Sequence, residues 1–110
     1  MPAGRAMLGP MELEFSGEVW HWRGPSPYHF VTVPPPHAAE LEAVKRLVTY
    51  GWGMIPVAAR IGGTPFTTSL FAKDGGFVLP VKDAVRVREG IEVGDTVEVH
   101  LTVEGPRPRR

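Results

Sequence analysis

Gly62-Gly63 and the residues on either side of it constrain the fold of this chain more than any other segment. Apolar residues stand at every second position from Ile55 to Ile61, which is the period of a β-strand with one buried face. The two glycines accept the positive φ angles of a two-residue hairpin turn, and the chain then continues from Thr64 to Phe71. The sequence therefore predicts an antiparallel hairpin. Because proline donates no ladder hydrogen bond, Pro56 and Pro65 must each lie at an edge, a strand end or a bulge.

Four more strands are predicted from alternation and from the turn residues between them. They span Met11–Trp22, Tyr28–Val33, Phe77–Val81 and Thr96–Val103. The first two are separated by the turn-forming segment Arg23 to Pro27, so we expect them to pair as a hairpin. Lys73 to Gly76 and Glu92 to Asp95 are predicted as the tight turns that lead into the last two strands.

One amphipathic helix is predicted between the second and third strands. Its acidic side chains precede its basic ones, which matches the helix dipole, and Gly51 and Gly53 are expected to end it just after Tyr50. A short helical turn is predicted from Lys82 to Arg88, with Gly90 as its stop. The apolar residues of the main helix recur at helical spacing and are Ala38, Leu41, Val44, Leu47 and Val48.

The glycines and prolines, 13 and 12 of the 110 residues, divide the chain into short elements, which favours β-structure over a helical bundle. Antiparallel strands joined by such turns commonly close into a barrel, because closure removes exposed edges. We therefore expect a mostly-β fold, a small antiparallel β-barrel of about six strands with one α-helix packed across it and one short helical turn. A two-layer α+β sandwich is the alternative. A single domain is expected over residues 11–104, with a loose N-terminal segment at 1–10 and a loose basic tail at 105–110.

Charge and composition narrow the function classes. Without residues 1–10 and 105–110, which hold four arginines, the chain carries eight basic and twelve acidic residues, so nucleic-acid binding is not expected. The absence of cysteine excludes disulfides and thiolate metal sites and suits a cytoplasmic protein. No apolar run has the length of a membrane span or a signal-peptide core. We predict a cytoplasmic protein without membrane association and without a cofactor.

Five segments carry a family pattern in their order and spacing: Gly51-Trp52-Gly53, Thr68 to Phe71, Phe77 to Lys82, Val85-Arg86 and Gly94 to Val99. Together they resemble the DUF1905 family of small prokaryotic barrel domains. The resemblance covers Leu13 to Val103 and implies a β-barrel with a helix laid across it. Members of that family occur alone or joined to a bacteriocin-protection domain of the YdeI/OmpD-associated type, and the family supplies no catalytic residues.

A second, fainter similarity links the string from Val78 to Val99 with swapped-hairpin transcription regulators of the AbrB/MazE type. Pro80 closes a strand, a helical turn follows, and Gly94-Asp95 makes the turn into the next strand. Such regulators bind DNA as dimers through basic residues. A regulator of this kind would present one basic face made by Arg60, Lys82, Arg86 and Arg88.

The candidate ligand-binding site consists of Trp22, Trp52, Thr68, Lys82 and Arg86. Lys82 and Arg86 lie four residues apart on the helical turn, where they would present two positive charges to an anion at the barrel mouth. A solvated surface, or pairing of Arg86 with a neighbouring carboxylate such as Asp83, is the alternative. Trp22 and Trp52 would line a pocket, unless the aromatic side chains only fill or cover the barrel.

Two tryptophans in the first strand bear on whether the aromatic side chains line a pocket or only fill or cover the barrel. By alternation, Trp20 and Trp22 share the face opposite Phe15 and Val19, so we expect at least one of them to be exposed.

No catalytic or metal-binding residue is predicted. The four histidines, at positions 21, 29, 37 and 100, form no i, i+2 or i, i+4 pair, and Ser69 lacks the Gly-x-Ser-x-Gly context of a nucleophile. We expect a ligand- or protein-binding module without catalysis, with a small ligand, a partner protein or a second copy of the chain as its partner. The alternatives are an AbrB/MazE-like DNA-binding regulator and an uncharacterised enzyme with a pocket near Lys82 and Arg86.

Overall fold

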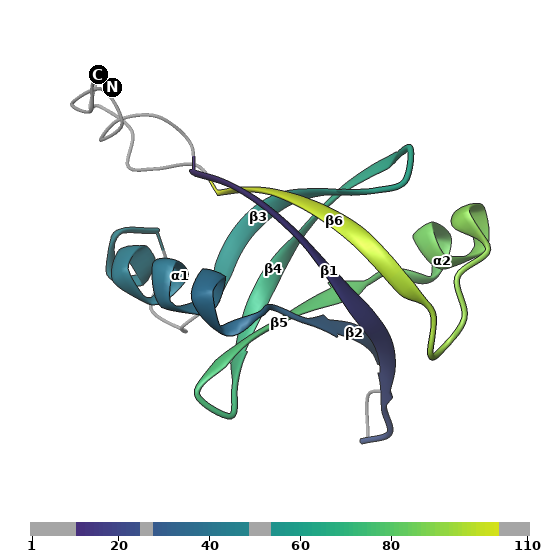
Figure 1. Cartoon of the computed structure of the whole chain (residues 1–110), viewed down its shortest axis with the longest axis horizontal. Helices are drawn as coiled ribbons and strands as arrows, with labels where there is room; N and C mark the ends of the chain where they lie inside the picture. Colours follow the sequence, from purple (N-terminus) through teal and green to yellow (C-terminus); the bar gives the residue numbers. More distant parts are fainter. Residues whose placement is uncertain (1–10, 25–27, 49–53, 104–110) are drawn as a thin grey trace.

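The computed structural model of this chain describes residues 11–24, 28–48 and 54–103 (Figure 1). They form a closed antiparallel barrel with the strand order β1-β2-β5-β4-β3-β6. The predicted barrel is therefore confirmed, and the sandwich alternative is wrong because the sixth strand pairs back onto the first. In chain order the elements are β1 Met11–Trp22, β2 Tyr28–Thr32, α1 Pro35–Val48, β3 Ile55–Ile61, β4 Thr64–Lys73, β5 Gly76–Val81, α2 Asp83–Glu89 and β6 Thr96–Val103.

The predicted hairpins are present. Ile61 pairs with Thr64 across the two-residue turn, in which Gly62 has a φ of 60°. Asp74 and Gly75, with φ of 53° and 81°, form the turn between β4 and β5, as the mirror-image turns of tight hairpins require. Pro56 and Pro65 both lie where their strand is paired on one side only, which confirms the predicted edge positions.

β1 closes the barrel by pairing with two different neighbours. Its residues Met11 to Glu18 pair with β6, and Val19 to Trp22 pair with β2. Gly17 lies at the change of partner, where a Cβ atom would come 2.6 Å from Cγ1 of Val31. A side chain at position 17 would therefore have to displace the fully buried side chain of Val31.

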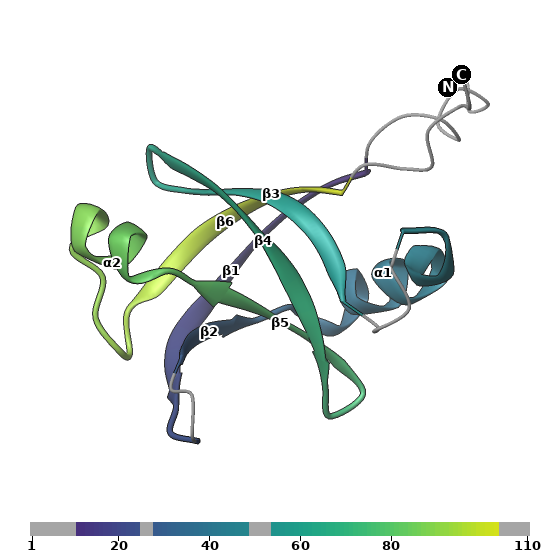
Figure 2. The same ribbon diagram turned by 180° about the vertical axis from the view of Figure 1, so that it is seen from behind.

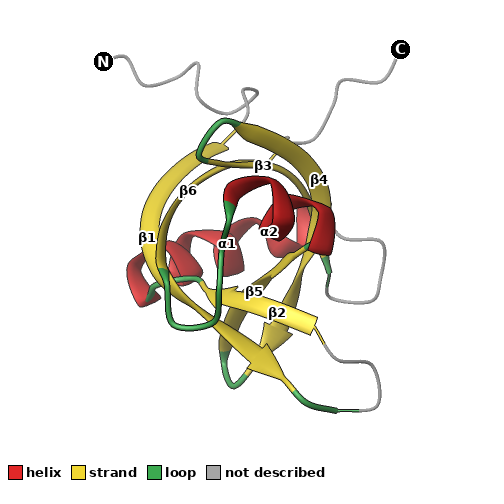
Figure 3. Cartoon of the chain, turned by 90° about the vertical axis from the view of Figure 1, so that its right-hand side faces the viewer, coloured by secondary structure: helices red, strands yellow, loops and turns green. Residues whose placement is uncertain are grey.

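The core fills the inside of the barrel and is closed at each end by a helix. Viewed along the barrel in Figure 3, the strands surround α2, while Figures 1 and 2 show α1 at the opposite end. Leu41 of α1 is fully buried and Val85 of α2 is 3% exposed, and both belong to the core cluster. Leu13 and Val19 point inward from β1, as the alternation predicts. Among the described residues, the helices thus cover the ends of the barrel, and the outer surface of the strands carries a separate set of side chains.

α1 begins at Pro35, three residues before Ala38, the first apolar residue of the predicted helix. Pro35 and Pro36 form its first turn, where the missing amide hydrogens cost nothing because those groups have no partner inside a helix. No acidic residue lies in that first turn, so the expected match with the helix dipole begins only at Glu40, which contacts His37 at 2.9 Å. The predicted end at Gly51 and Gly53 lies outside the described residues.

α2 is a seven-residue helix that ends as predicted at Gly90. Gly90 has a φ of 66°, and the amide of Ile91 donates to the carbonyl of Arg86 at 2.9 Å. This left-handed stop turns the chain toward the predicted Glu92 to Asp95 turn, in which the amide of Asp95 donates to the carbonyl of Glu92 at 2.9 Å. None of the helices in the part of the chain that the structure describes is long and apolar enough to cross a membrane.

Thr64 and Glu89 tie α2 to the β3–β4 hairpin. The hydroxyl of Thr64, which is 9% exposed, donates to the Glu89 carboxylate at 2.5 Å. We expect Thr64→Val to lower the free energy of unfolding by about 1–2 kcal/mol, because it removes the donor and leaves the shape of the side chain nearly unchanged. Urea unfolding of both proteins measures the loss. Thr67→Val, at an exposed position on the same strand, is the control, and equal stability of the Thr64 variant and the parent would contradict the contact.

Candidate aromatic binding site

Aromatic side chains gather on the outer side of the sheet formed by β2, β5 and the ends of β1 and β4. Trp20 pairs with Phe30 and Trp22 with Tyr28 across β1 and β2, and Phe71 pairs with Val78 across β4 and β5. Paired residues of antiparallel strands lie on the same face, and this face is opposite to the one that carries buried Val19 and Val31. We call this surface the aromatic face, and its members are Trp20, Trp22, Tyr28, Phe30, Phe71 and Val78.

The aromatic face has a small buried centre of its own. Phe30 and Val78 are only 5% and 3% exposed, although they lie outside the core cluster of the barrel. The ring of Phe30 lies 5.2 Å from that of Trp20, 5.8 Å from Tyr28 and 6.2 Å from Phe71, measured between ring centroids. These distances are those of tilted aromatic pairs, so the face is a packed layer rather than a set of separate side chains.

Trp22 lies at the solvent-exposed edge of this aromatic layer, which we call the rim, and has close neighbours on two sides. Nζ of Lys73 lies 4.7 Å from the centroid of its ring, and a Cβ atom at Gly24 would clash with its indole. Trp22 is nevertheless 41% exposed and the neighbouring Tyr28 is 46% exposed, which confirms that one of the two tryptophans of β1 is accessible. Trp20 is less exposed than Trp22, and its indole Nε1–H donates a hydrogen bond to the Thr32 hydroxyl at 2.9 Å. The rim therefore offers exposed ring surface in a defined orientation.

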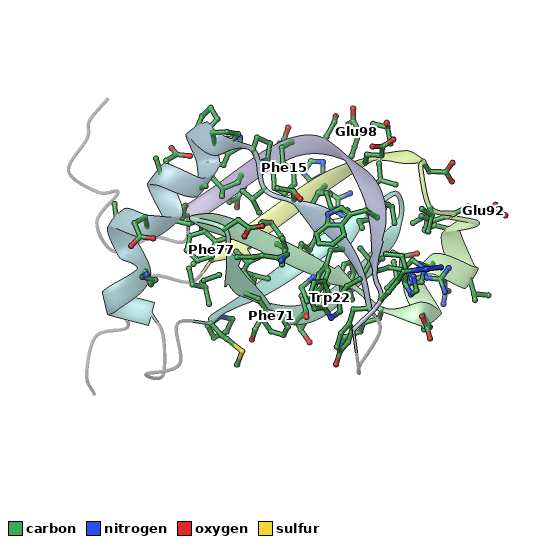
Figure 4. All side chains as sticks on the ribbon, turned by 90° about the horizontal axis from the view of Figure 1, so that it is seen from below. Phe15, Trp22, Phe71, Phe77, Glu92 and Glu98 are labelled. Atoms are coloured by element: carbon green, nitrogen blue, oxygen red, sulfur yellow. The ribbon has the colours of Figure 1, made fainter. Side chains whose placement is uncertain are left out.

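Two cavities meet at Trp22. One, of about 420 Å³, is lined by Trp22, Tyr28, Phe30, Phe71 and Lys73 together with two small apolar residues. Figure 4 shows two of these side chains, Trp22 and Phe71, next to each other. A cavity of this size accepts a small organic molecule.

The second cavity, of about 810 Å³, lies between the start of α1 and the β4–β5 turn. It shares Trp22, Lys73 and Val78 with the first cavity and adds Trp20 and the carboxylates of Glu42 and Asp74. Lys73 contacts Asp74 only loosely, at 3.6 Å, and the Asp74 side chain is 86% exposed. Trp22 and Lys73 thus line both a smaller cavity, to which the described residues contribute one positive charge, and a larger cavity, to which they contribute charges of both signs.

The residues predicted for one site lie in three different places. Trp22 is on the aromatic face, whereas Thr68 pairs with buried Val57 and so lies on the inward side of β4. Lys82 is exposed at the start of α2, and Arg86 borders a separate cavity of about 500 Å³ at the end of that helix. Trp52 lies outside the described residues. In the part of the chain that the structure describes, Trp22 therefore lines the first two cavities and Arg86 the third, and none of the three is lined by Thr68 or Lys82.

Sequence reasoning missed Tyr28, Phe30 and Lys73 as partners of Trp22. A signal was available, because a hairpin between β1 and β2 places alternate residues of both strands on one face. The five-residue loop between Trp22 and Tyr28 already makes these two aromatic residues cross-strand neighbours. Lys73 gave no comparable signal, since its place depends on β5 lying between β2 and β4.

His21 and His29 form a pair that their spacing in the sequence conceals. They are partners across β1 and β2, with ring centroids 4.7 Å apart, on the face opposite the aromatic one. His29 also pairs with Val81, the last residue of β5 before α2. Burial lowers the pKa of His29 below its ordinary value of 6.5, and the charges of Arg86 and His21 lower it further against the opposing effect of Asp83.

We expect His29 to titrate below pH 6.5 in the folded protein, and Arg86→Gln to move its pKa back toward that value. Removing the guanidinium charge makes protonation of the imidazole easier, while the contribution of burial stays. An NMR titration of the histidine ring protons measures both proteins, with His100 as the internal reference because it lies near Glu14 instead. A His29 pKa that stays the same or falls in the variant would contradict the influence of Arg86.

The fold and this surface define the class of protein as a small closed barrel of six antiparallel strands, capped by two helices and carrying an aromatic outer face. The family model described as "Domain of unknown function (DUF1905)" matches residues 15–101, and the chain belongs to this family. The match confirms the predicted resemblance and falls within the range expected for it. A comparison with curated proteins finds no match.

Proposed function

We propose that this domain is a binding module that holds a planar aromatic anion, such as an aromatic carboxylate or sulfonate, against the aromatic face. The observation that carries the proposal is the cavity of about 420 Å³ that four of the described aromatic side chains line together with one cation, Lys73. Apolar cavities with a few placed polar groups are the usual form of small-molecule sites. The absence of cysteine from the chain fits the cytoplasmic location that we propose for the module.

Stacking supplies the first part of the recognition. Trp22 and Tyr28 offer exposed ring surface at the rim, and Phe30 and Phe71 lie below them. A flat ring placed between them removes apolar surface from water and gains the offset or edge contacts that aromatic rings prefer. Because Phe30 is already packed on three sides, the layer loses little conformational freedom when a ligand binds.

Lys73 supplies the second part. Among the described residues that line the smaller cavity it is the only charged one, and its ammonium group already lies over the Trp22 ring. Its contact with Asp74 is long and exposed, so an incoming carboxylate or sulfonate displaces little when it pairs with Nζ. The sign of this charge favours an anionic over a cationic aromatic ligand.

Titration with anilinonaphthalene sulfonate, a fluorescent planar aromatic anion, tests the proposal. We expect one saturable site with a dissociation constant in the micromolar range, and competition by naphthalene carboxylate but not by a naphthalene that carries an ammonium group. Val87→Ala removes the most exposed large apolar side chain, on α2, and serves as the control that leaves binding unchanged. Non-saturable binding, or equal competition by the cationic compound, would contradict the proposal.

A further inference from the structure

The larger cavity meets the smaller one at Trp22 and Lys73. Both residues line both cavities, so a ligand whose ring lies against Trp22 in the smaller cavity also reaches the entrance of the larger one. The larger cavity, of about 810 Å³, is open to other groups of the same ligand. Its lining therefore bears on which groups the ligand carries besides its ring.

α1 and the β4–β5 turn bring two carboxylates to the larger cavity. A Cβ atom at Gly76 would come 4.0 Å from Cβ of Ala38, so the first turns of α1 lie against this turn. Glu42 follows Ala38 by four residues and lies on the same face of α1. Asp74 belongs to the turn itself, and both acidic residues line the cavity. Carboxylates from two elements therefore border one space.

A cation and an anion stand side by side at the entrance to this space. Nζ of Lys73 lies 4.7 Å from the centroid of the Trp22 ring and 3.6 Å from Oδ2 of Asp74. The Asp74 side chain is 86% exposed, and that of Glu42, which contacts Lys45 at 3.0 Å, is 60% exposed. Ion pairs with this exposure contribute little to stability, so a ligand exchanges them at small cost.

A purely anionic ligand suits only half of this arrangement. A carboxylate that pairs with Lys73 also comes close to Asp74, and like charges at such a distance repel. The described residues that line the larger cavity carry two carboxylates and one ammonium group, so the field on that side favours a cation. An ammonium group on the ligand, next to its carboxylate, would pair with Asp74 and offset the repulsion. Because Lys73 and Asp74 are so close, the two charges of the ligand must be close as well, as they are on the α-carbon of an amino acid.

We infer that the ligand is an aromatic α-amino acid, an inference that rests on the proposed function. Its ring lies against Trp22 and Tyr28 in the smaller cavity. Its carboxylate pairs with Lys73, and its ammonium group pairs with Asp74 at the entrance of the larger cavity. Glu42 adds to the negative field on the side of the ammonium group. The four charges of protein and ligand then alternate in sign.

Four compounds that share an indole ring test the inference by displacement of anilinonaphthalene sulfonate. Tryptophan carries both charges, indolepropionate carries the carboxylate alone, and tryptamine carries the ammonium group alone. N-acetyltryptophan keeps the carboxylate and has its amine blocked. We expect tryptophan to bind about threefold more tightly than indolepropionate or N-acetyltryptophan, the effect of one exposed ion pair, and tryptamine to bind most weakly.

Variants of the acidic residues make the result specific. Asp74→Asn removes the charge, and asparagine tolerates the φ of 53° at this position, so we expect the preference for tryptophan over indolepropionate to disappear. Asp74→Gly, which also accepts this φ, is a second variant should the first fold poorly. Glu42→Gln should reduce the preference by less than twofold. Glu98→Gln, at an exposed position on β6 that lines neither of the two cavities, is the matched control and should leave it unchanged.

The possible failures of this inference and of the proposed function are distinct. Equal affinity for tryptophan and indolepropionate, or a preference that stays unchanged in the Asp74 variants, would overturn the inference while the site for an aromatic anion stands. Probe binding that does not saturate, with no displacement by indolepropionate, would contradict the proposed function and the inference with it.

Discussion

Replacing Phe30 by alanine is expected to lower the free energy of unfolding by about 3 kcal/mol or more, the cost of removing a large buried aromatic side chain. Phe30 is 5% exposed and touches aromatic rings from β1, β2 and β4, so its loss opens a hole that three neighbours border. The melting temperature should fall on the order of 10 °C, since the chain has the size of a small domain. Thermal and urea unfolding followed by circular dichroism measure both quantities.

The control for this prediction lies on the same strand. Tyr28 is 46% exposed, so Tyr28→Ala should cost about 1 kcal/mol or less, as substitutions at the surface usually do. Phe30→Leu keeps most of the volume and should fall between the two. If Phe30→Ala destabilises the protein no more than Tyr28→Ala does, the aromatic face is not the packed layer that the ring distances indicate.

Trp22→Ala is expected to reduce the affinity for anilinonaphthalene sulfonate about thirtyfold, which corresponds to about 2 kcal/mol for a central aromatic contact. Trp22 lines both cavities, is 41% exposed and lies outside the core cluster, so its removal deletes the stacking surface and leaves the barrel core in place. Fluorescence titration measures the affinity, and an unfolding curve establishes that the barrel is intact.

A substitution at Lys73 distinguishes the contribution of charge to probe affinity from the contribution of ring stacking. Lys73→Met keeps an apolar stem beside the Trp22 ring but removes the ammonium group, so we expect a loss of about fivefold for the anionic probe and no loss for a neutral naphthalene. Unaltered affinity for the anionic probe in both the Trp22 and the Lys73 variants would show that the probe binds elsewhere.

Alternation and turn chemistry predicted most of the barrel because both are local. The hairpin at Gly62-Gly63, the turn that contains Asp74 and Gly75, and the stop at Gly90 each depend on residues that permit a positive φ, and all three are present. The start of α1 was harder to predict, because Pro35 and Pro36 follow directly on the predicted strand that ends at Val33, where prolines can also end a strand. Proline also suits the first turn of a helix, and the sequence alone does not distinguish the two roles.

The candidate site was harder to predict from the sequence than the barrel, because the site depends on which strands become neighbours. Trp22 was named, but its partners Phe71 and Lys73 come from β4, which reaches the aromatic face only through β5. The pair of His21 and His29 likewise arises from the register of β1 against β2, since eight positions separate them in the sequence. Contacts across strands carry no periodic signal along the chain, and a closed barrel consists mostly of such contacts.

The central claim, that the aromatic face is the ligand-binding surface, is tested most directly by mapping the bound probe onto the chain with two-dimensional NMR. During titration with anilinonaphthalene sulfonate, the largest shifts are expected at the indole N–H of Trp22 and at the amides of Tyr28, Phe71 and Lys73, which line the smaller cavity. The amides of Val87 and Val93, exposed apolar residues at the α2 end, should stay unchanged. Largest shifts at Val87 and Val93, with Trp22 unaffected, would contradict the claim.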